Sequence, residues 1–388
     1  MITKLSLEKF KCFDKKQDFQ LSKLNLFTGL NGRGKSTVFQ SLLLLSQSLI
    51  EKDNIEELFV NGNFIQLGLF EDIVFSLGEN KNQIVKFYIN TDEEYLQAIE
   101  LGYKESSERI GKISYMKINE IDYFQTSTSI QHTEKTTGER RLSAYPKETI
   151  NNFFKDYYFI SADRLGPTLY EEKGNKYDFN PVGILGEHRL NVLAEDRATN
   201  NLLFDEDAGT LLEEVNKWLD YIMDGVSLEI QGVEKEISVL YLLLNNHQNK
   251  IKIKAVNSGY GYSYILSIII TALLAEKGNV VFIENPEAHL HPRAQARLTE
   301  MLCKLAMIGV QVFVETHSEH IINGTRLFYL KHKADFSYKD VSMYFFGEDF
   351  NVEKLEMDSD AQISNWPTGF FDQQEIDLAE ILNLGLFK

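Results

Sequence analysis

The stretch GLNGRGKS, residues 29–36, decides the fold of this chain. It matches the pattern G-x-x-x-x-G-K-[ST] in full. Its glycines let backbone N–H groups wrap a chain of phosphates, Lys35 supplies a compact cation for the β- and γ-phosphates, and Ser36 supplies a hydroxyl for Mg²⁺. A chance match in a chain of this length has a probability on the order of 1%. The stretch predicts a nucleotide site whose contacts are Asn31, Gly32, Gly34, Lys35, Ser36 and Thr37.

The segments on either side of this stretch have the patterns of a strand and a helix. Residues 24–28 form a short apolar run that predicts a buried strand, and residues 38–49 predict an apolar helix. Residues 2–7 and 18–21 predict paired strands. From about residue 255 onward, strand-like and helix-like segments alternate, which indicates a parallel sheet covered by helices. The fold class that we predict is α/β.

A second stretch, NVVFIENPEAHLHPRAQ at residues 279–295, places an acid directly after four apolar residues. A buried strand delivers a carboxylate to a metal–nucleotide site in this way. We therefore predict that Glu284 holds Mg²⁺, directly or through water, opposite Ser36. The acid is followed by Asn285, Pro286 and a second acid, Glu287.

Two further stretches have the residues of a phosphate site. NSGYGYS, residues 257–263, puts small residues at the start of an apolar helix, where backbone N–H groups and the positive end of the helix dipole are exposed. It predicts a second phosphate-contacting element, and the alternative is a capped, buried helix. In VFVETHSEH, residues 312–320, His317 follows a predicted strand. That is the edge where ligands bind in open α/β sheets, so we predict a hydrogen bond between His317 and the γ-phosphate.

The composition narrows the class of protein. The chain has 388 residues, of which 43% are hydrophobic, and a net charge of −17. This acidic balance disfavours a broad DNA-coating surface, although a small basic groove remains open. The two cysteines suggest neither a metal site nor a disulfide framework. The longest apolar runs fall short of the ~20 residues that span a bilayer, and the amino terminus lacks the apolar core of a signal peptide. We expect no membrane contact and a cytoplasmic location.

Four regions organise the rest of the chain. Residues 82–150 predict an inserted β-rich arm with a mobile loop near 125–142. Residues 186–236 predict a mostly helical insert, and residues 237–256 a β-hairpin with a polar turn. Residues 340–388 predict a tail module, whose aromatic residues either dock on the core or bind a partner.

In their order along the chain, residues 29–36, 257–263, 279–295 and 312–320, the four motifs resemble those of the ABC-type ATPases of the SMC, RecF and OLD group. More narrowly, the chain resembles compact AAA-labelled ATPases of bacterial defence operons. SADRLGP at residues 161–167 and NGNFIQLGLFEDIVF at residues 61–75 are similar to that group as well. The tail WPTGFFDQQEIDLAEIL, residues 366–382, resembles a C-terminal domain of unknown function.

The resemblance implies one ABC-type head over residues 1–388, with a mixed or parallel central sheet and an antiparallel amino-terminal part. It also implies a head-to-head homodimer or a higher homo-oligomer driven by ATP and Mg²⁺. Each site would combine four residues of one subunit with two of the other: Lys35, Ser36, Glu284 and His317 with Ser258 and Gly259. Gln66 would be the metal-contacting glutamine, and its competitor, Gln40, is expected to face the core.

One position departs from the pattern of that group. The residue after the metal-binding acid usually polarises the attacking water, and here it is Asn285. An amide can hold a water molecule but cannot take its proton. Either Glu287 is the base and Asn285 orients the water, or hydrolysis is slow, since a base is worth roughly 10²- to 10⁴-fold in rate.

Three functions compete. The first is a slow ATPase that controls a separately encoded effector, a nuclease or toxin, in anti-phage defence or a DNA-damage response. The alternative is a hydrolysis-poor, nucleotide-sensing scaffold that sequesters an effector. The third, a self-contained OLD-like nuclease, is disfavoured because only about 70 residues follow the His317 motif. Binding to nucleic acid stays open.

Overall fold

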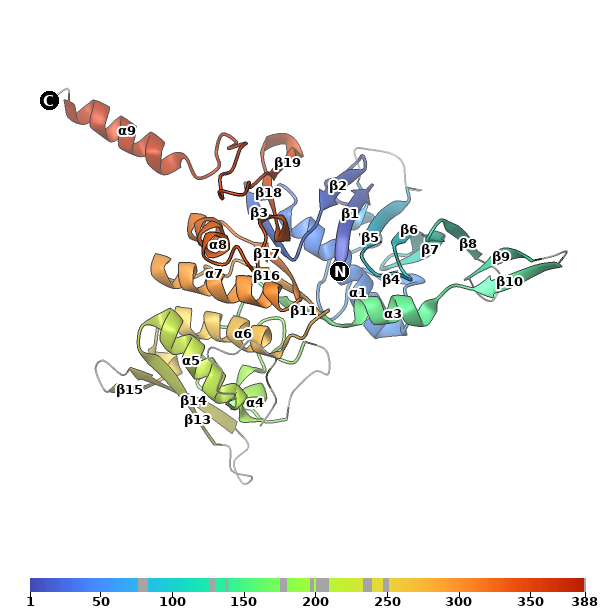
Figure 1. Ribbon diagram of the computed structural model, residues 1–388. Helices are drawn as coiled ribbons and strands as arrows, with labels where there is room; N and C mark the ends of the chain where they lie inside the picture. The colour runs from blue at the N-terminus through green and yellow to red at the C-terminus, as the bar shows by residue number, and fades with distance from the viewer. Residues whose placement is uncertain are drawn as a thin grey trace.

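The computed structural model describes residues 1–75, 83–125, 130–136, 139–174, 180–195, 199, 209–232, 239–246 and 251–386. Within them the chain forms three sheets: a six-stranded, mainly parallel sheet, a nine-stranded antiparallel sheet and a four-stranded antiparallel sheet. Figure 1 shows the nine-stranded sheet on one side of the parallel sheet and a stack of helices on the other. The predicted α/β class is confirmed.

The six-stranded central sheet contains the strand that leads into GLNGRGKS. In spatial order its strands are β11 (Tyr157–Ile160), β16 (Val280–Glu284), β17 (Gln311–Glu315), β3 (Leu24–Gly29), β18 (Val341–Phe346) and β19 (Val352–Leu355). The first five are parallel, and β19 is antiparallel to β18. Most side chains of the five parallel strands are buried on both faces, which is why these strands are rich in apolar residues.

Each face of the central sheet packs against a different layer. Side chains such as Val281 and Val312 share a core with α6 (Tyr260–Leu274), α7 (Pro292–Met307) and α8 (Glu319–Lys331). Their neighbours Phe282 and Phe313 face a second core, which includes α1 (Lys35–Lys52) and the apolar side chains of the nine-stranded sheet. The loop ahead of α1 is therefore held at the carboxyl edge of the central sheet, between the two layers.

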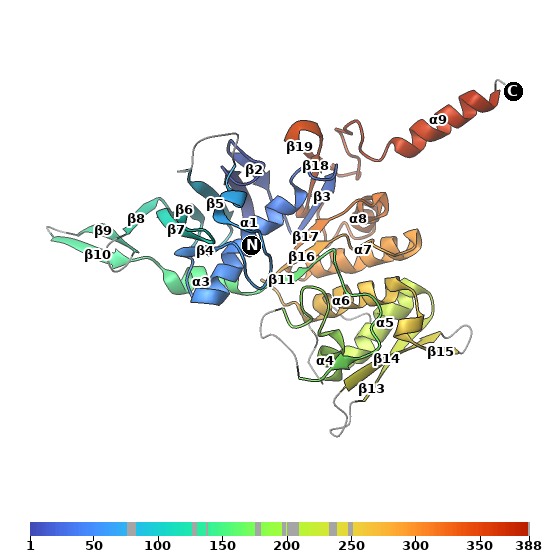
Figure 2. The ribbon, with the colours of Figure 1, turned by 180° about the vertical axis from the view of Figure 1, so that it is seen from behind.

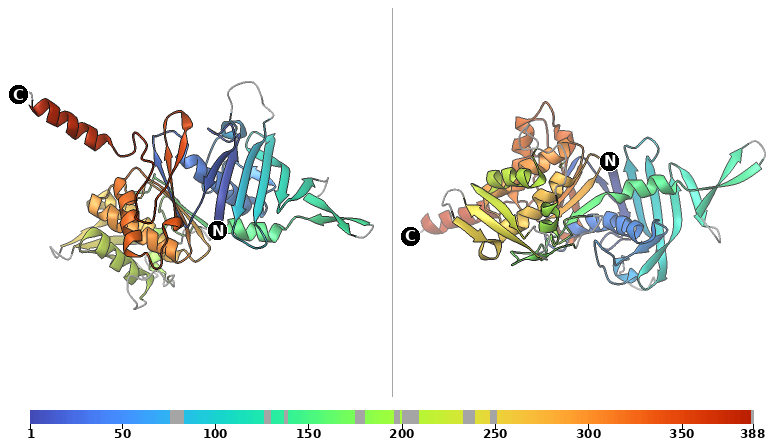
Figure 3. Two further views of the ribbon diagram at one scale, coloured as in Figure 1. Left: turned by 45° about the horizontal axis from the view of Figure 1, so that its top comes forward. Right: turned by 90° about the horizontal axis from the view of Figure 1, so that it is seen from below.

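The nine-stranded sheet combines the amino-terminal strands with most of residues 82–150. Its order is β10 (Glu139–Ala144), β9 (Ile130–Thr136), β8 (Ile121–Gln125), β7 (Ile110–Ile118), β6 (Ala98–Ser107), β5 (Val85–Thr91), β1 (Ile2–Glu8) and β2 (Gln17–Gln20), with β4 (Glu57–Phe59) beside β7. The region is β-rich, as expected, but it is not a separate arm, because β5 pairs with β1 over most of its length. Only the β8–β10 end projects from the head (Figure 3).

The loop expected near residues 125–142 is largely a hairpin, because β9 and β10 pair in register. Residues 126–129 and 137–138 of that prediction lie outside the described residues. Two short helices, α2 (Phe70–Ile73) and α3 (Lys147–Lys155), flank this part of the chain.

The region expected to be a helical insert, residues 186–236, is only partly helical. It contains α4 (Arg189–Ala194) and α5 (Leu211–Met223), and α5 begins with a capping box in which Thr210 and Glu213 exchange hydrogen bonds. It then forms a strand, β13 (Val226–Gln231), which pairs with β14 (Val239–Asn246). β14 also pairs with β15 (Ile251–Lys254), so the predicted hairpin is confirmed, although residues 247–250 of its turn are not described. β12 (Glu171–Glu172) completes this sheet.

Residues 340–388 are not a tail apart from the head. β18 lies beside β3 in the central sheet, and Phe346 pairs with Gly29. After β19 the chain returns to the sheet, where Phe370 packs against Phe345 and Trp366. Among the described residues of this segment, α9 (Gln373–Leu386) is the part that projects from the body, as Figures 1 and 2 show.

Candidate functional site

The loop between β3 and α1 has the shape of a phosphate cradle. Gly29 has a φ of 119°, and a Cβ there would lie 2.3 Å from the carbonyl oxygen of Phe346, so no other residue fits. Gly34, with a φ of 100°, caps α1 without a side-chain hydrogen bond. The first N–H groups of α1 are thus presented to the loop, where an anion would be stabilised by them and by the helix dipole.

Lys35 holds its charge inside this loop. The side chain is 3% exposed, and Nζ donates hydrogen bonds to the backbone oxygens of Gly29 (3.0 Å) and Leu30 (2.8 Å). Burial lowers the pKa of Lys35, and the Glu315 carboxylate opposes that shift. An incoming phosphate would therefore meet a cation that is already fixed in place.

Two cavities lie against the loop. The larger, of about 600 Å³, is lined by Lys11, Cys12, Gly32, Gly34, Lys35, Ser36, Thr37, Gln40, Glu71, Asp72, Val74, Glu315 and Phe350. The smaller, of about 240 Å³, is lined by Thr28, Gly29, Leu30, Asn31, His317, Phe345, Gly369, Phe370 and Phe371. Five of the predicted contacts line the larger cavity: Gly32, Gly34, Lys35, Ser36 and Thr37. Asn31 and His317 line the smaller one. The larger cavity is of the size of a small-molecule site.

Two acids stand at the carboxyl ends of neighbouring strands, where Glu284 of β16 pairs in register with Glu315 of β17. Ser36 Oγ donates a hydrogen bond to Glu315 Oε2 at 2.7 Å. Glu284 instead accepts one from the backbone N–H of Ala162 at 3.1 Å, and burial raises its pKa to about 7. Ser36 therefore contacts Glu315 directly, and Glu284, the acid predicted to hold Mg²⁺ opposite Ser36, ends the adjacent strand.

Glu315 has no role in the sequence prediction, although the signal for it is present. QVFVE in β17, like VVFIE in β16, is an apolar strand that ends in an acid. Burial raises the pKa of Glu315, and its hydrogen bond from Ser36 opposes the shift. A hydroxyl and a carboxylate beside a phosphate loop are hard oxygen donors, which is the ligand chemistry that Mg²⁺ prefers.

The residues after Glu284 are tightly held. Asn285 lies in the left-handed region with a φ of 44°, and its backbone N–H donates to the backbone oxygen of Glu315 at 2.8 Å. Its side-chain oxygen is buried and has no hydrogen-bond partner among the described residues. Glu287 accepts hydrogen bonds from the backbone N–H of His317 (2.6 Å) and from Thr316 Oγ1 (2.9 Å). Both carboxylate oxygens of Glu287 are therefore engaged in joining this turn to the His317 turn.

The signature turn, residues 257–259, lies apart from both cavities. Ser258 Oγ donates to the backbone oxygen of Ala255 at 2.6 Å, and Gly259 caps α6 with open space where a Cβ would be. Neither is among the described residues that line the two cavities. Gln66 is not brought to the site either: it is exposed in a loop, where it pairs with Asn61. Gln40, which was expected to face the core, lines the larger cavity.

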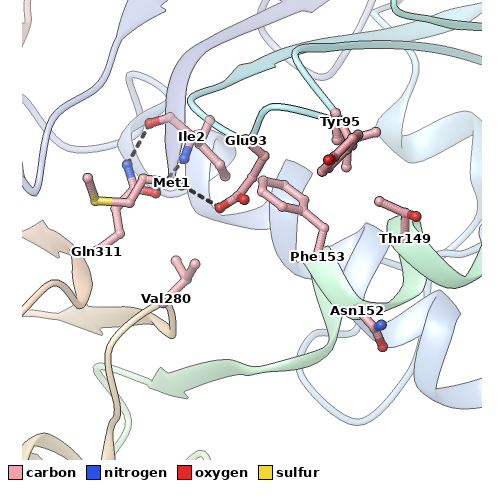
Figure 4. Close-up of a pocket in the computed structure, with 11 residues that line it drawn as sticks. Met1, Ile2, Glu93, Tyr95, Thr149, Asn152, Phe153, Val280 and Gln311 are labelled. Atoms are coloured by element: carbon pink, nitrogen blue, oxygen red, sulfur yellow. Dashed lines mark hydrogen bonds and ion pairs between the residues drawn. The ribbon is translucent and has the colours of Figure 1, made fainter.

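A third cavity, of about 360 Å³, lies at the amino-terminal ends of the central strands, where β16 and β17 begin. Figure 4 shows Gln311 bridging the backbone of Ile2 there, with Ile2 N–H donating to Oε1 at 2.8 Å and Nε2 donating to Ile2 O at 2.6 Å. Of the four nucleotide motifs, only Val280, at the start of β16, belongs to its described lining, and none of the predicted site residues does. Because ligands of open α/β sheets bind at the carboxyl ends of the strands, the two cavities at the phosphate loop form the candidate site.

A phosphate loop on a buried strand, with acids and a histidine at the ends of the adjacent parallel strands, defines a P-loop nucleotide-binding head. Residues 1–322 match the family described as the AAA ATPase domain, and the chain belongs to that family. Residues 336–381 match a family described as a protein of unknown function, DUF3696. The expected likeness of the tail to such a domain is thereby confirmed.

Solved structures with a similar fold are heads of SMC proteins. One is an SMC head bound to the C-winged helix domain of ScpA, with a TM-score of 0.52 and 13% identity over 92% of this chain and 98% of that chain. Another is an SMC head with an extended coiled coil bound to the C-terminal domain of ScpA from Pyrococcus furiosus, with a TM-score of 0.52 and 12% identity over 98% and 99%. At these identities the likeness shows the fold alone. A comparison with curated protein sequences gave no match. Among the described residues, no helix is both long and apolar enough to cross a membrane.

Proposed function

We propose that this chain is a Mg²⁺-dependent ATPase that works as a head-to-head dimer and controls a partner protein. The observation that carries the proposal is the arrangement at the carboxyl edge of the central sheet. There Lys35, Ser36 and Glu315 line one cavity, with the Ser36 hydroxyl hydrogen-bonded to Glu315 and the Lys35 ammonium 3.9 Å from it, and His317 and Asn31 line the other.

The residues present fit Mg²⁺. Ser36 and Glu315 would hold the ion, with Glu284 next to them on the adjacent strand. When bound, the ion would neutralise charge on the β- and γ-phosphates. Lys35 would bind the same phosphates from inside the loop, and His317 would approach the γ-phosphate from the smaller cavity.

The position of the signature turn supports a dimer. Ser258 and Gly259 are absent from the described linings of both cavities around Lys35, whereas the turn itself is open to solvent at Gly259. A phosphate contact from this turn therefore requires the nucleotide of a second copy. ATP would then hold two heads together, which is the interface that the SMC-like sequence motifs imply.

The environment of Asn285 supports slow hydrolysis. Its buried side-chain oxygen, which has no partner in the described part of the chain, can accept a hydrogen bond from water, but an amide cannot remove a proton. Glu287 would have to leave its hydrogen bonds to Thr316 and His317 before it could act as a base. A missing base costs roughly 10²- to 10⁴-fold in rate, so the ATP-bound dimer would be long-lived.

The partner and the biological setting rest on resemblance. The two SMC heads described above are each bound to a domain of ScpA, so a head of this fold can carry another protein. By analogy with the defence-type ATPases, we propose a separately encoded nuclease or toxin as the effector, in anti-phage defence or a DNA-damage response in the cytoplasm. The second candidate, a nucleotide-sensing scaffold that holds the effector without turnover, is favoured by Asn285 alone.

The test is ATP turnover and oligomeric state for the wild type, Lys35→Ala, Glu287→Gln and Asn285→Asp. Aspartate tolerates the left-handed backbone at residue 285 as asparagine does, so Asn285→Asp adds a carboxylate with little strain. We expect Lys35→Ala to lose ATP binding and Asn285→Asp to raise turnover. If Glu287→Gln abolishes turnover and traps a dimer, Glu287 is the base. ATP-driven dimerisation without turnover supports the nucleotide-sensing scaffold. If Lys35→Ala binds ATP with wild-type affinity, both the ATPase and the scaffold are refuted.

A further inference from the structure

The loop of residues 161–166 holds the strand end that carries Glu284. Arg164 lies at its centre, and its side chain is 3% exposed. Nη1 donates hydrogen bonds to the backbone oxygens of Ser161 (3.0 Å) and Glu284 (2.7 Å), and Nη2 donates to that of Asn285 (2.6 Å). The Glu284 carboxylate accepts a hydrogen bond from the same loop, at the backbone N–H of Ala162. The loop therefore fixes both the backbone and the acid at this strand end.

The same guanidinium group packs against α6, the helix that starts at the signature turn. It lies over the ring of Tyr264, with 5.0 Å between its carbon and the ring centroid. Tyr264 meets the ring of His289 edge-on at 4.7 Å, and His289 lies 5.3 Å from the ring of Tyr260, the first residue of α6. Gly166 also approaches Tyr260 closely, since a Cβ there would lie 2.4 Å from that ring. The loop thus contacts the signature helix at two points.

We propose that Arg164 is a positioning residue that couples the signature turn of each protomer to Asn285 in that protomer's own nucleotide site. The inference rests on the proposed head-to-head dimer, in which the signature turn touches the nucleotide of the partner. A shift of α6 moves the Tyr264 ring against which the guanidinium group packs. The guanidinium group in turn holds the carbonyl of Asn285, and so sets where the amide side chain points.

An arginine suits this position because its planar fork presents several N–H donors in a fixed geometry. Here the fork reaches three carbonyl oxygens while its carbon lies over an aromatic ring. Lysine would keep the charge but has neither the flat face nor the fork. Asn285 is held on both sides by backbone contacts, since its N–H donates to the backbone oxygen of Glu315 and its own backbone oxygen accepts from Arg164 Nη2.

The coupling works in both directions, because an effect of one binding event on another is reciprocal. Nucleotide bound beside Glu284 and Asn285 would arrange α6 to receive the partner, and the partner would in turn set Asn285. The two sites of a dimer would therefore respond to each other through two copies of the same contact.

The experiment uses the full chain with Arg164→Lys and Tyr264→Leu, and with Tyr264→Phe as the matched control that keeps the ring. For each variant we would measure the Kd for ATP at a protein concentration where the chain is monomeric, ATP-driven dimerisation by sedimentation, the turnover number and the thermal midpoint. A merely structural role would lower the thermal midpoint and weaken all functions together. If Arg164 couples the two sites, the variants should keep their affinity for ATP while they lose dimerisation and turnover.

We expect Arg164→Lys and Tyr264→Leu to bind ATP within about twofold of the wild type, because neither side chain lines the two cavities. We expect both to dimerise less with ATP and to lose roughly 10- to 100-fold in turnover number, as small misplacements near a reacting group do. Tyr264→Phe should match the wild type. The double variant should be no worse than Arg164→Lys alone, since that change already removes the contact that Tyr264→Leu breaks.

Two results would overturn the coupling. One is a Tyr264→Leu variant that dimerises and turns over as Tyr264→Phe does. The other is a wild type that binds ATP and hydrolyses it as a monomer, which would leave the ATPase standing and remove the second site. If the wild type dimerises without turnover, the extent of ATP-driven dimerisation of Tyr264→Leu and Tyr264→Phe decides whether the coupling exists. Failure of the wild type to bind ATP would refute the proposed function itself.

Discussion

Glu315→Gln tests which acid meets the metal beside the phosphate loop. Glu315 accepts the hydrogen bond of Ser36 at 2.7 Å and lies 3.9 Å from the Lys35 ammonium, whereas Glu284 is held by the backbone of Ala162. Glutamine keeps the shape of the side chain and removes its charge. Two effects should follow: Lys35 loses a carboxylate that competes with phosphate, and the metal loses a ligand.

The size of both effects follows from the geometry. At an effective dielectric constant of about 20, two unit charges about 4 Å apart interact by about 4 kcal/mol. The desolvation of the two charges offsets part of this, because the side chains of Lys35 and Glu315 are only 3% and 12% exposed. If about 2 kcal/mol remains, ATP should bind Glu315→Gln roughly 30-fold more tightly than the wild type without Mg²⁺. The gain in affinity that Mg²⁺ adds should shrink by roughly the same factor.

The assay is a titration of ATP in EDTA and in Mg²⁺ for the wild type, Glu315→Gln and Glu284→Gln, with Mn²⁺ binding followed by electron paramagnetic resonance. Glu315→Gln should lose most of the Mg²⁺ enhancement and the bound Mn²⁺ signal, and Glu284→Gln should lose less of both. The reasoning is refuted if Glu284→Gln loses the enhancement while Glu315→Gln keeps it. The contact between Ser36 and Glu315 would then be structural, and Glu284 would be the ligand.

Three further outcomes follow from single contacts. Gly29→Ala should lower the free energy of unfolding by at least about 2 kcal/mol in urea titrations, because its Cβ would collide with the Phe346 carbonyl at a φ of 119°. The contribution of Glu284 to the stability of the nucleotide-free protein should fall between pH 4.5 and about pH 7. Burial raises the pKa of Glu284 from 4.5 to about 7, so the protonated form stabilises the fold below pH 4.5, and this contribution is lost as pH rises through 7. The difference in urea midpoint between the wild type and Glu284→Gln should therefore change over this pH range. Ending the chain at Asp372 should leave the Kd for ATP and the thermal midpoint unchanged in calorimetry, because Ile381 and Leu382 of α9 are 63% and 64% exposed.

Segments whose local pattern agrees with their packing could be predicted from the sequence. β3 and α1 flank the phosphate loop as expected. The buried apolar face of α5 begins at Leu211, directly after the capping box of Thr210 and Glu213. β13 was missed because its six residues follow a helix directly and its partner, β14, comes later in the chain. β18 was assigned to a tail because parallel pairing with β3 joins opposite ends of the chain and leaves no local signal.

The site shows the same division. Lys35 and Ser36 follow from one contiguous motif, and the structure places them together on the wall of one cavity. The pairing of Ser36 with Glu315 depends on β17 lying beside β3 in the sheet, which the chain order does not reveal. The choice between Gln66 and Gln40 depends on which side of α1, the helix that contains Gln40, faces the cavity. Because α1 is buried nearly all round, its sequence has no single apolar face from which that side could be predicted.

The boundary between the two family matches does not divide the structure. Phe346, within the segment of unknown function, supplies the backbone oxygen that restricts residue 29 to glycine and accepts the N–H of Leu30 at 2.8 Å. Beyond it, the ring of Phe350 lies 5.6 Å from the guanidinium carbon of Arg33 and lines the larger cavity, while the turn at residues 369–371 lines the smaller one. The segment therefore borders the phosphate loop on both sides, and α9 begins two residues after the second contact. A rearrangement of the loop around nucleotide would act directly on the turn at residues 369–371, which immediately precedes α9.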